Sequence, residues 1–176
     1  MIIIKKMAVV LVLLWSNAIF AADDLAKELS WAKPFLNIVW RGDLTTEPGK
    51  KMTDHSYWQR ALNGQAIKVI HSVNDGDYGG ESIIFYDKAK QSLAYYYFTT
   101  AGFYTHGTMQ YYPEDGRLVA EEQVENNAEG VTKVRSTSLL KAGELQTNAE
   151  YFKQGQWVAG HSAKYYPSKD GRVLFK

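Results

Sequence analysis

Four histidines, at positions 55, 71, 106 and 161, are the side chains best suited to metal binding or acid–base chemistry. No two of them follow the His-x-His or His-x-x-x-His spacing that would place two imidazoles side by side, so no local motif predicts a metal site. A solitary histidine on a strand is usually satisfied by a hydrogen bond or by solvent. We therefore expect no metal and no cofactor.

Nucleophilic catalysis is not predicted either. In "TDHSYW" the residues Asp54, His55 and Ser56 are adjacent, but neighbours on a strand point to opposite faces and cannot form a relay with one another. The chain has no Gly-x-Ser-x-Gly motif, and it has no cysteine that could supply a thiolate, a zinc ligand or a disulfide. These absences favour a binding protein over an enzyme, although they do not decide between them.

Acidic residues and an arginine come together in the segments "GRLVAEEQVEN" and "GVTKVRSTSLL", which read as one antiparallel hairpin. If Arg135 points inward it must pair with a carboxylate, from Glu121 or Glu122, because an unpaired buried guanidinium is very costly. It could then hold the anionic head of a ligand. The alternative is an exposed cross-strand ion pair that contributes little.

Tyrosines dominate the stretch from Ser92 to Gly116, and strand alternation separates them into two sets. One face would carry Leu93, Tyr95, Tyr97 and Thr99, and the other Ala94, Tyr96, Phe98 and Thr100. By the same rule His71 shares a face with the apolar residues of "QAIKVIHSV". Tyr95, Tyr97 and His71 are therefore candidate wall residues of a ligand site, although tyrosines on strands more often serve packing alone.

The elements that must position these residues are strands. Turn signals such as Asn63-Gly64, Asp115-Gly116 and Gln154-Gly155 recur every 12 to 14 residues, and the segments between them are rich in β-branched and aromatic residues. This pattern predicts about ten antiparallel strands between Ile38 and Tyr166. A short helix is expected before them, over 24–36, where Pro34 would end it early.

So many consecutive antiparallel strands twist and must hide their edges, so we expect an all-β fold that closes into a single up-and-down barrel. A two-sheet sandwich is the alternative, but it needs longer connections than these turns provide. A barrel of eight to ten strands has an interior that side chains either fill or line as a cavity. The ligand hypothesis requires the second case.

The 176 residues, 45% of them hydrophobic, are enough for one domain. Residues 1–21, in which Lys5 and Lys6 precede an apolar run, resemble a cleaved secretory signal, and 22–176 would form the barrel. The run is too short for a membrane anchor, which is the alternative. We therefore expect a periplasmic or secreted protein without a stable membrane span.

Removing Lys5 and Lys6 with the signal leaves 18 basic against 19 acidic residues, a formal charge of −1. A nucleic-acid partner is therefore not expected.

The order of a helix, "FLNIVWRGD", "YWQRALNGQAIKV" and "GGESIIFYDKAKQSLAYYYFTTAGF" resembles the secreted bacterial calycin-like barrels of the DUF1579 type. The sequence departs from that group at "IVWRGD" and "LNGQ", where Gly-x-Trp and a double glycine are usual. The similarity of this fold to lipocalins and fatty-acid-binding proteins implies a cavity for a hydrophobic small molecule. It supplies no established catalytic residue.

Three functions follow as hypotheses. The first is an exported barrel that binds a small apolar or amphipathic molecule in its lumen, with Tyr95, Tyr97, His71, Arg135 and Glu122 as ligand-binding residues. The second is a lyase or isomerase acting on a phenolic or lipid-like substrate with luminal Tyr, Glu and Arg; it requires an inward glutamate with a raised pKa near Arg135 or a tyrosine. The third is an envelope scaffold, which requires a contiguous exposed aromatic patch.

Overall fold

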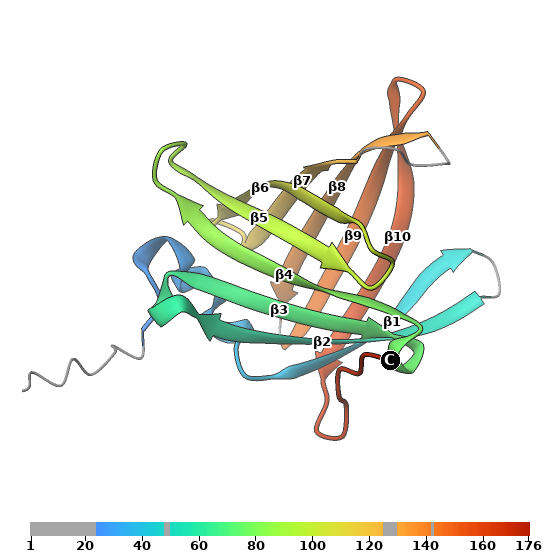
Figure 1. The fold of residues 1–176 in the computed structure, drawn as a ribbon, viewed down its shortest axis with the longest axis horizontal. Helices are drawn as coiled ribbons and strands as arrows, with labels where there is room; N and C mark the ends of the chain where they lie inside the picture. The colour runs from blue at the N-terminus through green and yellow to red at the C-terminus, as the bar shows by residue number, and fades with distance from the viewer. Residues whose placement is uncertain (1–23, 48–49, 125–129, 142) are drawn as a thin grey trace, which may run out of the picture.

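The computed structural model describes residues 24–47, 50–124, 130–141 and 143–176, so the predicted signal over 1–21 lies outside the described residues. Ten antiparallel strands form a closed barrel in which each strand pairs with its neighbours in the chain and β1 pairs with β10 (Figure 1). This confirms the predicted up-and-down barrel and excludes the sandwich. The strands are β1 (Val39–Glu47), β2 (Lys50–Ala61), β3 (Ala66–Val73), β4 (Tyr78–Asp87), β5 (Ser92–Thr99), β6 (Tyr104–Tyr112), β7 (Arg117–Gln123), β8 (Val131–Lys141), β9 (Glu144–Lys153) and β10 (Gln156–Pro167).

The predicted turn positions fall between consecutive strands. At seven of them a glycine has a φ between 74° and 93°, a backbone conformation that other residues rarely adopt. Two of these turns contain short 3-10 helices, η2 (Leu62–Gly64) and η3 (Asn74–Gly76). The spacing of these turns determines which strand residues lie opposite one another, and hence which side chains share the lumen.

The segment before the barrel differs from the expected helix over 24–36. It forms a shorter and narrower 3-10 helix, η1 (Lys27–Phe35), with Pro34 inside it. Proline has no N–H to donate and crowds the preceding turn, which disfavours a regular α-helix here. The helix buries Leu29, Trp31, Ala32 and Phe35.

The hydrophobic core lies where η1 meets the barrel. Apolar side chains of the helix join inward-facing residues from most of the strands in one cluster, which includes Trp40, Ile67, Ile84, Leu93, Leu118 and Leu145. The Trp40 indole Nε1 donates a hydrogen bond to the Phe35 carbonyl oxygen at 3.1 Å, which attaches the end of the helix to β1. Apolar side chains therefore occupy much of the helix side of the lumen.

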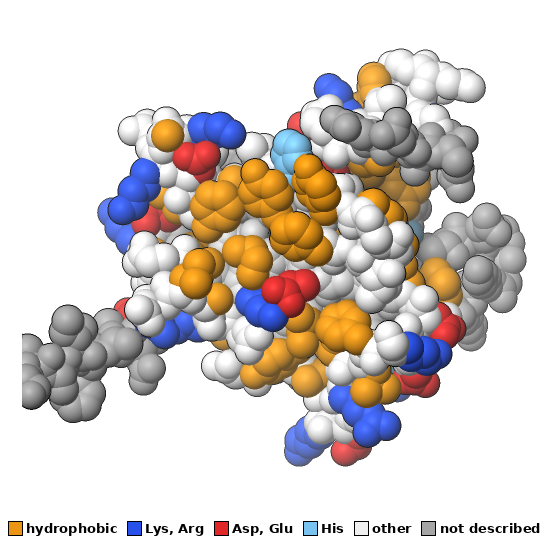
Figure 2. Space-filling model, viewed as in Figure 1, with side chains coloured by type: hydrophobic (Ala, Val, Ile, Leu, Met, Phe, Trp, Pro, Cys, Tyr) orange, Lys and Arg blue, Asp and Glu red, His pale blue; other side chains and the backbone are white. Residues whose placement is uncertain are grey.

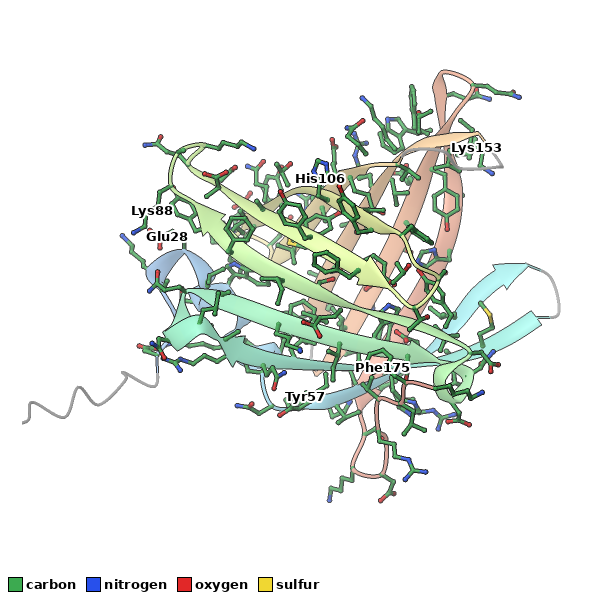
Figure 3. All side chains as sticks on the ribbon, in the orientation of Figure 1. Glu28, Tyr57, Lys88, His106, Lys153 and Phe175 are labelled. Carbon is green, nitrogen blue, oxygen red and sulfur yellow. The ribbon has the colours of Figure 1, made fainter. Side chains whose placement is uncertain are left out.

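The two ends of the barrel differ in chemistry. At the helix end, marked by Glu28 in Figure 3, the inward-facing residues are mostly apolar. At the opposite end, toward the β9–β10 hairpin where Lys153 lies, the inward-facing residues include Asp54, His71 and Glu122. We call this half of the lumen the polar end.

The chain after β10 packs on the outside of the barrel. The Ser168 N–H donates to the Val39 carbonyl at 2.7 Å, and the Leu174 N–H donates to Ser72 Oγ at 3.0 Å. Ser72, on the outer face of β3, is thereby almost fully buried. Among the described residues, none of the helices has the length and apolar character needed to cross a membrane.

Candidate functional site

Five polar side chains at the polar end form a connected hydrogen-bond array, which we call the luminal array. His71 lies in the middle: its Nδ1 is 3.0 Å from Asp54 Oδ1, and its Nε2 is 2.7 Å from the Tyr97 hydroxyl. The Tyr97 hydroxyl also donates to the Tyr78 hydroxyl at 3.0 Å, and the Tyr165 hydroxyl donates to Asp54 Oδ2 at 2.8 Å. The array thus joins side chains from β2, β3, β4, β5 and β10.

The array runs from a buried carboxylate to partly exposed groups. The Asp54 side chain is 5% exposed, whereas the His71 side chain, which faces the same lumen, is 23% exposed. Tyr78 and Tyr97 are also only partly buried. Because these side chains point inward, their exposure means that solvent enters the polar end of the barrel.

A second carboxylate lies close to the array. Glu122 Oε2 accepts hydrogen bonds from the Thr105 hydroxyl at 2.6 Å and from the Tyr95 hydroxyl at 3.2 Å. Burial raises the pKa of Glu122, while the two hydroxyl donors lower it to a smaller extent. We call Glu122, Thr105 and Tyr95 the Glu122 group.

The inward tyrosines are held in their neutral form. Burial is the main cause that raises the pKa of Tyr78, Tyr95, Tyr97 and Tyr165, and the negative charge of Asp54 or Glu122 raises it further in each. These phenols therefore act as hydrogen-bond donors and acceptors at neutral pH, not as phenolates.

His161 on β10 adds a further imidazole on the same side. Its Nδ1 is 2.7 Å from the Tyr151 hydroxyl, and burial lowers the pKa of its ring, with Asp54 acting weakly in the opposite direction. The described residues contain no group of three or more histidine or acidic side chains arranged to hold a metal ion.

Glycines on neighbouring strands make room for the tyrosine rings. A Cβ on Gly42 of β1 would come within 2.5 Å of the Tyr165 ring, and a Cβ on Gly160 would come within 2.9 Å of the Tyr151 ring. The Tyr97 ring lies against Gly80 of β4 in the same way. Each of these large rings therefore lies over a strand position without a side chain, which determines how the phenols are oriented.

Four of the five residues expected to bind a ligand lie inside the barrel, where His71 and Tyr97 belong to the array and Tyr95 and Glu122 to the second group. Arg135 does not join them. It lies on the outer face of β8, where its Nε is 2.7 Å from Glu121 Oε1 and its guanidinium covers the Trp157 ring at 4.3 Å. The inward placement considered for Arg135 is therefore wrong, because β8 turns Val134, Ser136 and Ser138 inward and charged side chains avoid burial.

Five further residues of this region were not predicted as site residues from the sequence: Asp54, Tyr78, Tyr165, Thr105 and His161. Asp54 was considered only with its chain neighbours, yet its partner is His71 on the next strand. The Asn63-Gly64 turn pairs Ala61 with Ala66, so continuing that register places Ser56 opposite His71 and Asp54 on the same face. Counting back from the turn could therefore have found this pair.

A separate hollow of about 800 Å³ lies at the other end of the barrel, between η1 and strands β4–β6. Its walls include Trp31, Leu93, Met109 and Tyr111, with Lys27 and Glu28 beside them. None of the residues of the luminal array lines it. Its size suits a small molecule, and its walls combine core side chains with polar residues, but none of the hydrogen bonds of the luminal array extends to it.

The outer surface of β4–β6 carries an aromatic patch, which Figure 2 shows as neighbouring hydrophobic side chains on the front of the barrel. Phe85, Tyr96, Phe98 and Tyr104 form a chain of ring contacts with centroids 6.0 to 6.5 Å apart, and we call them the outer aromatic face. Tyr96 is 43% exposed and Tyr104 61% exposed. His106, labelled in Figure 3, contacts Tyr96 at 5.6 Å.

Comparisons with known proteins support the fold alone. No family model matches the sequence, so the resemblance to the DUF1579 type is not confirmed. No curated protein matches it either. Among solved structures, the barrel is similar to the crystal structure of Rv2717c from M. tuberculosis, with a TM-score of 0.60 and 13% sequence identity. The match covers 83% of this chain and all of Rv2717c.

Proposed function

We propose that the protein binds a small amphipathic molecule in the polar end of its barrel lumen. The observation that carries this proposal is the luminal array, in which side chains from five strands converge on one inward surface that solvent still reaches. Surrounding tyrosine rings would contact the apolar part of the ligand, while the hydroxyls of Tyr78 and Tyr97 would bind its polar group.

The electrostatic cost of this arrangement supports a functional role. Asp54 is buried and contacts His71 and the Tyr165 hydroxyl, and the partly buried Glu122 accepts hydrogen bonds from two hydroxyls, an environment that a core built for stability alone would avoid. Clusters of buried ionisable groups with shifted pKa values are typical of functional sites. The hollow beside η1 lacks such groups, so we assign the function to the polar end.

We propose further that the protein works outside the cytoplasm, in a periplasm or in secreted form. This rests on the signal-like residues 1–21. N-terminal sequencing of the protein recovered from its own host would test the proposal. A start within or just after this segment is expected, whereas an intact Met1 would contradict it.

Native mass spectrometry of the protein purified from its own host tests the binding function. We expect a retained small molecule in the wild type and a much smaller bound fraction in the Tyr97→Phe variant. The matched control is Tyr96→Phe, which removes a hydroxyl from the same strand but on the outer face. Equal retention in both variants would contradict a site in the polar end.

A second candidate function is acid–base catalysis, and Glu122 is the observation that favours it. Glu122 points inward, burial raises its pKa, and Tyr95 donates a hydrogen bond to it. A carboxyl group whose pKa is raised by burial can act as a general acid or base. His71 lies on the same inward surface and links Asp54 to the Tyr97 hydroxyl by hydrogen bonds.

The keto–enol tautomerisation of acetylacetone is a suitable probe, because one proton moves from carbon to oxygen and no co-reactant is needed. The catalytic function predicts a rate above that of buffer, lost in Glu122→Gln and kept in Glu121→Gln, whose side chain is on the outer face with Arg135. The absence of any rate above buffer in the wild type would contradict it for this class of reaction.

The scaffold role would use the outer aromatic face, which meets the requirement for a contiguous patch. It can be separated from luminal binding with the double variant Tyr96→Ser/Phe98→Ser. Luminal binding predicts that this variant retains the small molecule as the wild type does. Loss of the molecule from a folded double variant would contradict it.

A further inference from the structure

The polar end contains two carboxylates, Asp54 and Glu122. No lysine or arginine among the described residues forms an ion pair or hydrogen bond with either of them. Among the described residues, His71 is the side chain with a basic nitrogen that contacts Asp54. Arg135 lies on the outer face and therefore supplies no guanidinium to the polar end.

Glu122 has no positively charged side chain in contact among the described residues, whereas Asp54 contacts the His71 imidazole. Hydroxyl groups satisfy the hydrogen bonds of both carboxylates, but neutral donors do not offset the loss of hydration as a nearby positive charge would. Burial and the hydrogen bond to Tyr78 are the main causes that raise the pKa of Tyr97, and the negative charges of Asp54 and Glu122 raise it further. A cationic ligand would supply the positive partner that Glu122 lacks among the described residues.

Aromatic rings surround the same space. The His71 ring centroid is 5.5 Å from that of Tyr97 and 6.1 Å from that of Tyr78, so these two phenol rings flank the centre of the array. The face of an aromatic ring attracts a cation, and cages of such rings bind ammonium groups. The protein contains an example nearby, because Lys153 Nζ lies 5.9 Å from the centroid of the Tyr151 ring.

We propose that the ligand of the polar end is a cation, namely an amine or quaternary ammonium group carried on an apolar body. The ammonium group would lie against the Tyr78 and Tyr97 rings and beside Glu122, and the apolar body would contact the remaining tyrosine rings. This proposal rests on the proposed binding function and names its ligand class. It also reverses the expectation of an anionic head, which depended on an inward Arg135.

Isothermal titration calorimetry with three ligands of equal chain length tests the charge preference. The probes are octyltrimethylammonium, octanoate and octanol, each titrated below its aggregation concentration into the mature protein. We expect the ammonium ion to bind at least about tenfold more tightly than octanoate, with octanol between them. Equal affinities, or tighter binding of octanoate, would overturn the proposal.

Two luminal variants and one control on the outer face test which residues determine the ligand affinity. Glu122→Gln keeps an acceptor for Thr105 and Tyr95 but removes the charge, so the ammonium affinity should fall about tenfold while that of octanol changes less than about twofold. Glu121→Gln, on the outer face, should change neither. Tyr97→Phe keeps the ring but removes the hydroxyl bonded to His71, so it should lower the affinity for all three ligands to a similar extent. An unchanged ammonium affinity in a folded Glu122→Gln variant would overturn the assignment to this carboxylate.

The results separate this inference from the proposed function. If octanol and octanoate bind, and the ammonium ion binds no better than octanoate, luminal binding stands and the cation preference is wrong. If none of the three ligands binds, and the protein from its own host also retains no molecule, then the proposed function itself is wrong. Urea denaturation of each variant confirms that the comparison concerns folded protein.

Discussion

His71 connects a buried carboxylate to two phenols, and each member of the luminal array depends on its neighbours for hydrogen bonding. A buried polar group that loses its partner costs more than the bond itself contributed, because the group was already removed from water. The array is therefore sensitive to the loss of a single atom. This sensitivity allows its role in the fold to be measured separately from its role in binding.

Removing the Tyr97 hydroxyl should destabilise the protein. In Tyr97→Phe the His71 Nε2 and the Tyr78 hydroxyl both lose their partner, which should lower the free energy of unfolding by about 1–3 kcal/mol. Tyr96→Phe, on the exposed face of the same strand, should change it by less than about 0.5 kcal/mol. Urea denaturation measures both values, and equal effects would contradict the hydrogen-bond account.

Glu122 should give stability a pH dependence of known sign. Burial raises its pKa in the folded protein above the unfolded value, so its contribution to stability is fully present below the ordinary pKa of about 4.3 and is lost as pH rises through the raised value. Glu122→Gln removes this term. The free energy of unfolding of the wild type minus that of the variant should therefore decrease between pH 4 and 8, and an increase would contradict the burial argument.

At the scale of strands, the site depends on glycines as much as on the polar residues. Gly42 lies directly opposite Tyr165 in the β1–β10 pair, and the ring occupies the space that a side chain would fill. Tyr97 and Tyr151 use Gly80 and Gly160 in the same way. The phenol rings are thus oriented by glycines on the paired strands, because a glycine leaves space for the ring where another residue would place a side chain.

Gly42→Ala should overpack this contact. The added methyl group would meet the Tyr165 ring at 2.5 Å, which should cost about 1–3 kcal/mol of stability. In a Tyr165→Leu background the same substitution should cost less than about 1 kcal/mol, since the ring is absent. A double-mutant cycle in urea tests this prediction. An equal cost in both backgrounds would show that the strain lies in the backbone and not against the ring.

The strands were predictable from the sequence, whereas the array was only partly so. Regular Gly-containing turns and alternating segments gave the number of strands and the faces of Tyr95, Tyr97 and His71, because these depend on local geometry. The contact of Tyr165 with Asp54 depends on barrel closure, which joins residues 111 positions apart. Arg135 could not be placed because both faces of its strand carry mixed side chains.

At the scale of the whole molecule, the two ends of the barrel differ in the chemistry of their inward-facing side chains. The helix η1 and the core cluster fill one end, and this packing supports the strands that hold the array at the other. Leu29→Ala should therefore cost about 2–5 kcal/mol of stability while leaving the affinity of the folded protein for its ligand unchanged within about twofold. Denaturation and calorimetry on the same sample test this. A large loss of affinity in the folded variant would contradict the independence of the two ends.

A crystal structure of the protein purified from its own host, with its bound molecule retained, tests the central claim most directly. The account predicts density for a small molecule inside the polar end, in contact with Tyr78 and Tyr97 and beside Glu122. Density in the hollow between η1 and β4–β6, or on the outer aromatic face, with ordered water alone around the luminal array, would contradict it.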